Sequence, residues 1–325
     1  MKHWVRGLSG RKKIEFAAFF VVIIVLFIIP LLPGTTDNSM RIAFNIAIYA
    51  TLAQMWNLLC GHAGMLALGQ QLFIGVSGFM TAIMCTTYGL PFAFAMGASG
   101  LISAGFALFV SVLLLRMRGL YFAIATWVFA EMIKILFTGW GAINYSGGMT
   151  INVVPYPTLG QQFQMALGLA AAAFIIVYAI LNSKLGLGLS AMRDDPDAAE
   201  GLGVSIFKSK TLTFVICGFV TGMCGSLIYL NKLSIFPNGA FSMDWTIAIV
   251  FSVIIGGIGT AIGPIVGGAI YVSLFNVLAR YPGYSNVIMG IIAIAVIVTA
   301  PKGIVGTVQS LLKMEFFSSN RPSLE

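Results

Sequence analysis

Two charged residues inside an apolar segment are the first candidates for chemistry in this sequence. Glu131 and Lys134 are three residues apart, so on a helix their side chains share one face. A charge in the bilayer core costs at least about 2.5–3.5 kcal/mol on insertion scales, so such groups usually face a partner or a water-filled cavity. The pair therefore has two interpretations: a self-neutralising ion pair, or part of a path for a polar solute.

A glycine-rich interruption between two apolar segments, residues 61–71, is the second candidate. Non-helical backbone at membrane depth is tolerated only where it is buried in protein or lines a water-filled cavity. The backbone groups and glutamines of this break could bind a polar solute or could satisfy one another, and both interpretations stay open. Together with Glu131 and Lys134, the residues that we assign to a translocation path are Gly61, His62, Gly64, Gly69, Gln70 and Gln71.

The densest charge inside the chain lies in residues 183–210. Asp195 is a suitable N-cap, Pro196 suits the first helical position, and a glycine at 201 or 203 can end the helix. A solvated link would need only two to eight residues. A longer connector with its own capped helix predicts a docking surface for a partner. The residues assigned to it are Arg193, Asp194, Asp195, Asp197, Ala198, Ala199, Glu200, Gly201 and Gly203, with both alanines expected to be exposed.

Several other kinds of site are excluded by what the sequence lacks. It contains no Gly-Lys pair and therefore no P-loop for ATP. It also offers no cluster of histidines and carboxylates for a metal ion, and no catalytic pair. The glycines at 257, 259 and 263 lie in an apolar run without a βαβ context, so we expect close helix packing there. Cys217 and Cys224, seven residues apart on one helix, are expected to be small core residues.

The composition indicates which kind of fold must position these residues. The chain has 325 residues, of which 59% are hydrophobic and 9% charged. An average soluble domain carries roughly 25% charged residues, and disorder requires low hydrophobicity, so neither class fits. The apolar stretches are long and continuous, as in helical membrane proteins rather than barrels. We predict an all-α, polytopic helical membrane protein with about ten transmembrane helices (eight to ten), and glycine-broken helices in both halves.

The hydrophobic pattern and the placement of the basic residues predict a topology. The basic segment 1–15 is expected in the cytoplasm, because Lys and Arg concentrate in cytoplasmic loops. An even number of spans also places residues 183–210 and 301–325 there, within a single transmembrane domain covering 1–325. The loop 139–162 then lies outside, with Asn144, Gly147 and Gly148 at the outer mouth. The expected spans are 16–32, 42–60, 72–88, 92–115, 119–137, 163–181, 211–230, 245–262, 264–279 and 287–300.

Six blocks of the sequence resemble the LivM-type permease subunit of branched-chain amino acid ABC importers. They run in family order over roughly residues 45–306. The chain departs from the family at His62 and Met65, where Tyr and Gln are more usual. The resemblance therefore leaves open a related permease for urea, short amides or aromatic acids. The blocks are 56–70, 118–126 with Ala130-Glu131, Gly147-Gly148, 193–203, 255–264 and 301–306.

The resemblance also implies partners and a mechanism. It implies a homologous second permease subunit of the LivH type, two cytoplasmic ATPase subunits that bind ATP and Mg²⁺, and a periplasmic substrate-binding protein, in a bacterial inner membrane. It implies no enzymatic activity and no cofactor in this chain, and no nucleic-acid partner. ATP-driven movement of the 183–210 helix would tilt the bundle between inward and outward access. A stand-alone secondary transporter or channel is the alternative, with Glu131 and Asp244 as its available carboxylates.

Overall fold

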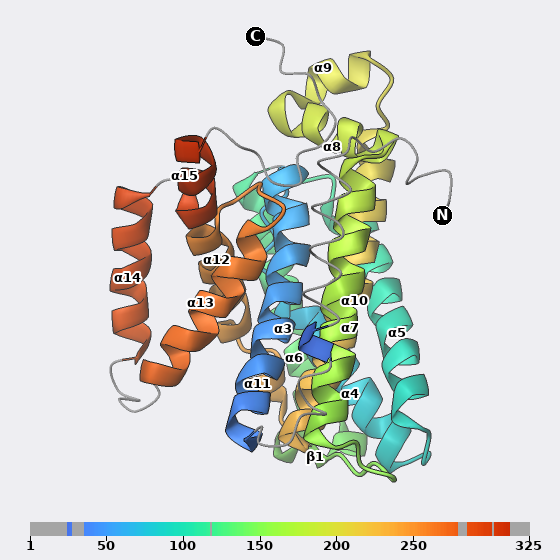
Figure 1. Cartoon of the computed structure of the whole chain (residues 1–325). Helices are drawn as coiled ribbons and strands as arrows, with labels where there is room; N and C mark the ends of the chain where they lie inside the picture. Colours follow the sequence, from blue (N-terminus) through green and yellow to red (C-terminus); the bar gives the residue numbers. More distant parts are fainter. Residues whose placement is uncertain (1–24, 28–35, 118, 279–284, 301, 313–325) are drawn as a thin grey trace, which may run out of the picture.

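The computed structural model describes residues 25–27, 36–117, 119–278, 285–300 and 302–312. Within these residues nearly all regular structure is helical, and two short strands, β1 (Met149–Thr150) and β2 (Ser234–Ile235), pair antiparallel. The prediction of an all-α polytopic fold is confirmed. Figure 1 shows long helices lying side by side between one end of the molecule, where α9 projects, and the opposite end, where β1 lies.

The order of the elements follows the expected spans closely. Most expected spans coincide with helices to within a few residues, and capping explains several starts; Thr158 and Gln161, for example, form a capping box at α7. The elements are α3 (Asp37–Asn57), η2 (Leu58–His62), α4 (Gln71–Thr86), α5 (Phe92–Leu114), α6 (Leu120–Thr138), η3 (Gly141–Ile143), η4 (Tyr145–Gly147), α7 (Leu159–Leu181), α8 (Lys184–Asp194), α9 (Pro196–Gly201), α10 (Ile206–Lys232), α11 (Pro237–Ala240), α12 (Asp244–Gly256), α13 (Gly263–Leu278), α14 (Ser285–Thr299) and α15 (Gly303–Leu312).

The described part of the chain contains fewer candidate spans than the eight to ten expected for the whole chain. In the described part of the chain, seven helical segments are long and apolar enough to cross a bilayer. Helices α4 and α13 have 16 residues each, and that length spans only about 24 Å of a hydrocarbon core about 30 Å thick. Of the expected first span only residues 25–27 are described. The predicted cytoplasmic segment 1–15 lies outside the described residues, as do 301 and 313–325 of the C-terminal segment.

Among the helix boundaries that differ from the predicted ones, those of α10 and α12 have clear physical reasons. Helix α10 begins at Ile206 rather than at 211, because the basic residues before the apolar run form its first turns. Helix α12 ends at Gly256 rather than at 262. Gly257 and Gly259 have φ values of 124° and 78°, which residues with a side chain rarely adopt. This stretch is therefore a turn between α12 and α13 rather than a continuous helix.

Small residues hold α10 against α5 in the centre of the bundle. A Cβ atom at Gly218 would lie 2.6 Å from the Cβ atom of Ala107, and one at Gly222 would lie 2.6 Å from that of Ser103. Both glycines stay helical, so small residues allow α10 and α5 to pack closely. On the same helix, Cys217 and Cys224 are fully buried free thiols, as predicted.

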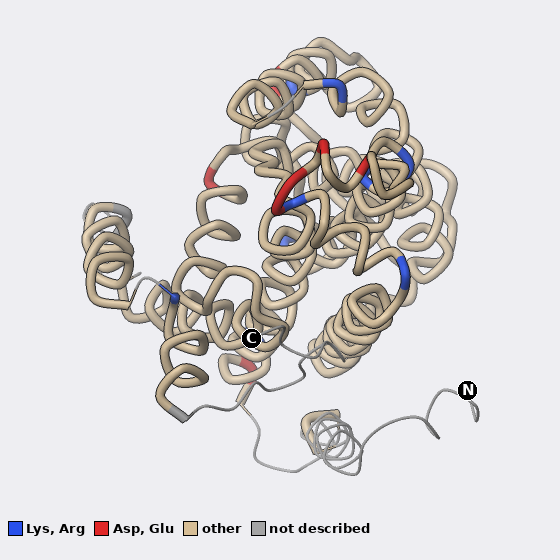
Figure 2. Tube along the Cα trace, turned by 90° about the horizontal axis from the view of Figure 1, so that it is seen from above, with Lys and Arg blue, Asp and Glu red and all other residues tan. Residues whose placement is uncertain are grey.

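The outer helices expose apolar side chains over much of their length. On α5, α6 and α14 these include Leu101, Ile135 and Val298, each more than half exposed. A soluble monomer rarely presents such continuous apolar surface. Seen from the α9 end, the chain trace carries Lys, Arg, Asp and Glu at few places (Figure 2). The composition of the spans and this surface together identify a multi-pass membrane protein.

Candidate functional site

The charged connector 183–210 folds into helices α8 and α9, which project from one end of the bundle (Figure 1). The Asp195 carboxylate accepts hydrogen bonds from the backbone N–H groups of Asp197 at 3.0 Å and Ala198 at 3.1 Å. Pro196 is the first residue of α9, and Gly203 follows its end with a φ of 85°. The structure therefore has the predicted cap, short helix and stop.

The projection exposes most of the residues assigned to it, with one exception. Ala199 is only 1% exposed and belongs to the main hydrophobic core, so the expectation that it is exposed is wrong. The physical reason is that so short a helix needs a buried face to hold it against α8. Leu202, which the sequence did not single out, is 83% exposed at the end of α9. The exposed residues are Arg193, Asp194, Asp195, Asp197, Ala198, Glu200, Gly201 and Gly203.

The first glycine break is a π-helical turn, η2, followed by an extended segment that leads into α4. Other parts of the protein satisfy its backbone groups. The Trp56 indole N–H donates to the Ala67 carbonyl at 2.8 Å, and the Leu68 N–H donates to the Thr126 hydroxyl at 3.1 Å. A Cβ atom at Gly69 would overlap the Thr126 carbonyl, so this glycine permits close approach to α6. These contacts favour the interpretation in which the break is satisfied internally.

Burial differs among the residues of this break that were assigned to the path. Gly64 is exposed, whereas the other five are buried. The Gln70 side-chain oxygen accepts from the Thr221 hydroxyl at 3.4 Å, and the Gln71 oxygen accepts from the Thr246 hydroxyl. The side-chain nitrogens of both glutamines are buried without a hydrogen-bond partner. A role in the path stays a prediction for these residues, and the five buried ones are Gly61, His62, Gly69, Gln70 and Gln71.

The turn between α12 and α13, residues 257–263, is a second glycine break. It packs directly against the first break, an arrangement that the sequence did not predict. The Asn57 side chain accepts from the Gly259 N–H at 2.8 Å and donates to the Thr260 carbonyl at 2.9 Å. The Gln54 side chain donates to the Ala261 carbonyl at 3.1 Å. A Cβ atom at Gly61 would lie 2.6 Å from the Gly259 nitrogen. We call residues 57–64 and 257–263 together the glycine junction. The feature of the sequence that could have indicated this contact is the pair of amide side chains at 54 and 57 in an otherwise apolar helix.

The predicted pair Glu131 and Lys134 forms an ion pair on α6. The two side chains are 31% and 25% exposed. Their neighbours Val128 and Ile135 are exposed apolar residues. The pair therefore lies on the outward surface of this chain rather than in its core. Both interpretations, a structural pair and a part of the solute path, stay open.

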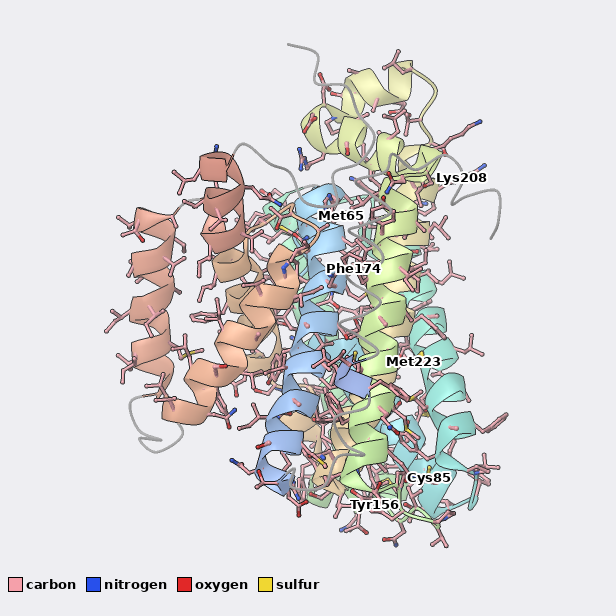
Figure 3. The ribbon with its side chains drawn as sticks, viewed as in Figure 1. Met65, Cys85, Tyr156, Phe174, Lys208 and Met223 are labelled. Atoms are coloured by element: carbon pink, nitrogen blue, oxygen red, sulfur yellow. The ribbon has the colours of Figure 1, made fainter. Side chains whose placement is uncertain are left out.

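The predicted outer-mouth residues lie at the β1 end of the molecule. Asn144 and Gly147 are exposed in the turns before β1, whereas Gly148 is buried. Gly148 has a φ of 67°, and a Cβ atom there would overlap the Ile235 carbonyl oxygen of β2. The structure thus gives Gly148 a packing role, because it lets the loop approach β2. In Figure 3, Cys85 and Tyr156 mark this end of the bundle and Lys208 marks the opposite end.

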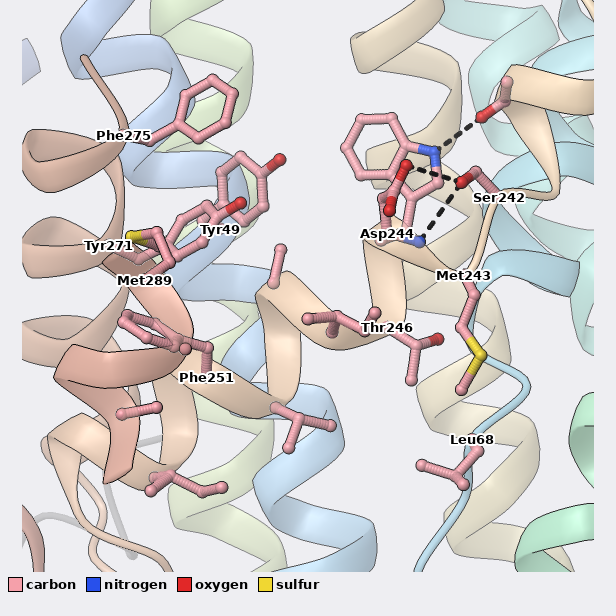
Figure 4. Close-up of a pocket in the computed structure, with 18 of the residues that line it drawn as sticks. Tyr49, Leu68, Ser242, Met243, Asp244, Thr246, Phe251, Tyr271, Phe275 and Met289 are labelled. Carbon is pink, nitrogen blue, oxygen red and sulfur yellow. Dashed lines mark hydrogen bonds between the residues drawn. The ribbon is translucent and has the colours of Figure 1, made fainter. Parts of the chain in front are cut away.

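A cavity of about 960 Å³ lies beside α12, bordered also by α3, α13 and α14. The sequence did not predict this cavity. In Figure 4, Tyr49, Tyr271 and Phe275 face the space from one side, and Leu68 of the first break and Met243 lie on the other. The feature of the sequence that could have indicated the cavity is the set of aromatic residues in the segments that form α3, α12 and α13.

Polar groups line the part of this cavity that is close to the β1 end. Lys232 and Asp244, the last residue of α10 and the first of α12, both line it and are both exposed. The Lys232 ammonium lies 4.6 Å from the centroid of the Trp245 ring, a cation–π contact. The Ser242 hydroxyl and the Asp244 carboxylate form a hydrogen bond of 2.9 Å (Figure 4). The cavity therefore combines an apolar, aromatic wall with one cation and one anion.

Comparison with known proteins identifies the family. The profile described as branched-chain amino acid transport system / permease component matches residues 38–299. The high-affinity branched-chain amino acid transport system permease protein LivM of Salmonella typhimurium is 25% identical over 309 residues, covering 86% of this chain and 72% of that protein. The LivM protein of Escherichia coli is 24% identical over 342 residues, covering 96% of this chain and 79% of that protein.

A relative of a second type also matches. The probable branched-chain amino acid transport permease protein LivH of Methanocaldococcus jannaschii is 26% identical over 150 residues, covering 43% of this chain and 45% of that protein. No solved structure matches this chain. In the described residues, no group of three or more His, Cys, Asp or Glu side chains could hold a metal ion. Because the family profile covers most of the chain, this protein belongs to the family of branched-chain amino acid transport system permease components.

Proposed function

We propose that this chain is a permease subunit of a binding-protein-dependent ABC importer for branched-chain amino acids or a related small solute. The observation that carries the proposal is the family match over residues 38–299. The projecting α8–α9 element on a bundle of apolar helices supports it. The family is one of transport permeases rather than enzymes, and the sequence lacks a P-loop, so the energy must come from another subunit.

The partners that we propose are a homologous LivH-type permease, two ATPase subunits that bind ATP and Mg²⁺, and a periplasmic binding protein. The match to both LivM and LivH relatives supports a pair of homologous permeases. The exposed Ala198, Glu200 and Leu202 supply a surface for an ATPase. We place the α9 end in the cytoplasm of a bacterial cell with an inner membrane. Lys184 and Lys208 flank the projection, as the positive-inside rule requires.

The chemistry of the cavity beside α12 supports an apolar amino acid as the solute. Its aromatic wall, which includes Tyr49 and Tyr271, suits an apolar side chain. Lys232 and Asp244 offer charges opposite to those of an α-carboxylate and an α-ammonium group. Urea or a short amide would leave most of this apolar surface uncovered. An aliphatic or aromatic amino acid therefore fits the lining better.

We propose that the Glu131–Lys134 ion pair is structural. Neutralising one partner would leave the other charge unpaired on the apolar face of α6, at a cost of about 2.5–3.5 kcal/mol at the centre of a span. We therefore expect Glu131→Gln to lower the membrane yield of the folded chain, and the double variant with Lys134→Gln to restore part of it. Yield is measured by size-exclusion chromatography in detergent. A normal yield of Glu131→Gln with altered uptake would instead assign Glu131 to the solute path.

The proposed function is tested in proteoliposomes. The chain is reconstituted with the proposed LivH-type permease, ATPases and binding protein, and uptake of radiolabelled leucine is followed. We expect uptake that needs ATP, Mg²⁺ and the binding protein. A complex that lacks this chain, and one whose ATPases cannot hydrolyse ATP, are the controls and should take up nothing. Uptake by this chain alone, driven by an ion gradient, would overturn the proposal in favour of a stand-alone transporter.

A further inference from the structure

We propose that Arg193 is a positioning residue that ties the α8–α9 projection to the glycine junction. Through this tie, a displacement of the projection moves the points at which α3 and α12 end. The inference rests on the proposed function, because it assigns the projection to receive the movement of an ATPase. It differs from an ATPase contact in that Arg193 acts inward, on this chain itself.

The tie is a charged hydrogen bond to the backbone. Arg193 Nη1 donates to the carbonyl oxygen of Gly61 at 2.7 Å, across 132 positions of sequence. Gly61 lies in η2, the π-helical turn with which the first break begins. Carbonyl groups at a helix end carry partial negative charge and lack intrahelical donors, so a guanidinium group there is favourable. The contact therefore joins α8 to the end of the α3–η2 helix.

Gly64 makes room for the arginine in the first break, and the guanidinium group lies close to Gly259 of the second. A Cβ atom at Gly64, which has a φ of 67°, would lie 3.1 Å from Arg193 Cγ and 3.3 Å from its Cα. A Cβ atom at Gly259 would lie 3.8 Å from Arg193 Nη1. The side chain thus lies over the first break and reaches the second. The contact at Gly64 gives a physical reason for a glycine at this position, independent of the hydrogen bond.

The glycine junction connects the Arg193–Gly61 contact to the end of α12. Asn57 holds the second break through the Gly259 N–H and the Thr260 carbonyl. Gly61, which accepts from Arg193, would meet the Gly259 nitrogen at 2.6 Å if it carried a Cβ atom. A shift of Gly61 must therefore be followed by the turn at which α12 ends, since interiors are too densely packed to absorb it. Helix α12 lines the cavity proposed for the solute.

The geometry requires arginine in particular. While Nη1 holds Gly61, Nε donates to the Asp194 carboxylate at 3.1 Å. A planar guanidinium group can make both bonds at once, whereas a lysine ammonium group lacks this fixed fork. The Arg193→Lys variant should therefore keep the positive charge but hold Gly61 less firmly than arginine does.

The experiment compares Arg193→Gln and Arg193→Lys in the complete importer with Lys208→Gln as the matched control. Lys208 is an exposed basic residue at the same end of the molecule (Figure 3). The first measurement is the amount of solute taken up per ATP hydrolysed. We expect Arg193→Gln to lower this ratio by about tenfold, the effect of losing one charged hydrogen bond. Arg193→Lys should give an intermediate ratio, and Lys208→Gln the wild-type ratio.

The second measurement needs no partner subunit. Cys60 lies in η2 beside Gly61 and is partly buried, whereas the other three cysteines are buried. In membranes containing the full chain, we expect Arg193→Gln to raise the rate of Cys60 alkylation by N-ethylmaleimide by about tenfold, because η2 loses its anchor. Cys60→Ser in the same background identifies the signal. Lys208→Gln should leave the rate unchanged.

The outcomes separate the tie from the proposed function. If Arg193→Gln leaves the rate of Cys60 alkylation unchanged, Arg193 does not anchor η2 and the proposal is wrong. If the rate of Cys60 alkylation rises while the amount of solute taken up per ATP hydrolysed stays normal, the contact of Arg193 with Gly61 has no role in coupling. If the wild-type importer moves no solute at all, the proposed function fails, while the Cys60 comparison still tests the tie. Arg193→Lys keeps the comparison informative if Arg193→Gln is recovered in low yield.

Discussion

Replacing Ala198 by arginine is expected to abolish ATP-dependent uptake while leaving the chain folded in the membrane. Ala198 is exposed in the first turn of α9, so a larger side chain there can extend into solvent. On a docking surface it would hold the partner away from the helix. A disrupted interface hot spot costs about 2 kcal/mol or more, which corresponds to at least about 30-fold in ATPase association. Uptake in proteoliposomes and co-purification of the ATPases measure the effect.

The matched controls for this variant use the same helix. Ala198→Ser keeps a small side chain and should retain uptake. Ala199→Arg changes the adjacent alanine, which is 1% exposed, and should lower the yield of folded chain because a charge enters the core. If Ala198→Arg loses uptake while the yield of folded chain stays normal, the exposed surface of α9 is needed for docking rather than for folding. If Ala198→Arg binds the ATPases and transports normally, α9 is not the docking surface.

Replacing Gly267 by alanine is expected to destabilise the fold more than any exposed substitution. A Cβ atom at this position of α13 would overlap the Ser252 carbonyl oxygen and lie 2.9 Å from the Gly256 nitrogen, both on α12. These are backbone atoms, so they cannot move aside as a side chain can. Overpacking of this kind costs about 1–3 kcal/mol, occasionally more. The midpoint of thermal unfolding in detergent should fall accordingly.

Gly105→Ala on α5 is the matched control for this substitution. The same change occurs in a membrane-spanning helix, but nothing lies within 4 Å of the added atom. Alanine there should leave the unfolding midpoint near that of the wild type. Equal midpoints for the two variants would contradict the close packing of α12 and α13 and the position of the second break.

Local chemistry allowed much of this protein to be predicted from the sequence. The low content of charged residues excluded a soluble fold, because such a chain cannot cover a water-facing surface. The short helix α9 followed from Asp195, Pro196 and Gly203, because a cap, a first-turn proline and a glycine stop act within a few residues. The Glu131–Lys134 pair followed from helical spacing.

Contacts between distant segments were decided by the tertiary structure alone. Gly218 and Gly257 both lie in apolar, glycine-containing runs, yet the first stays helical and the second ends a helix. The difference comes from what surrounds each glycine: Ala107 of α5 fits against Gly218, whereas Asn57 holds the turn that begins at Gly257 through its backbone groups. The burial of Ala199 and the cavity beside α12 depend in the same way on packing. The sequence determined which segments are helical and apolar, and the packing of segments about 200 residues apart decided where the two glycine breaks meet.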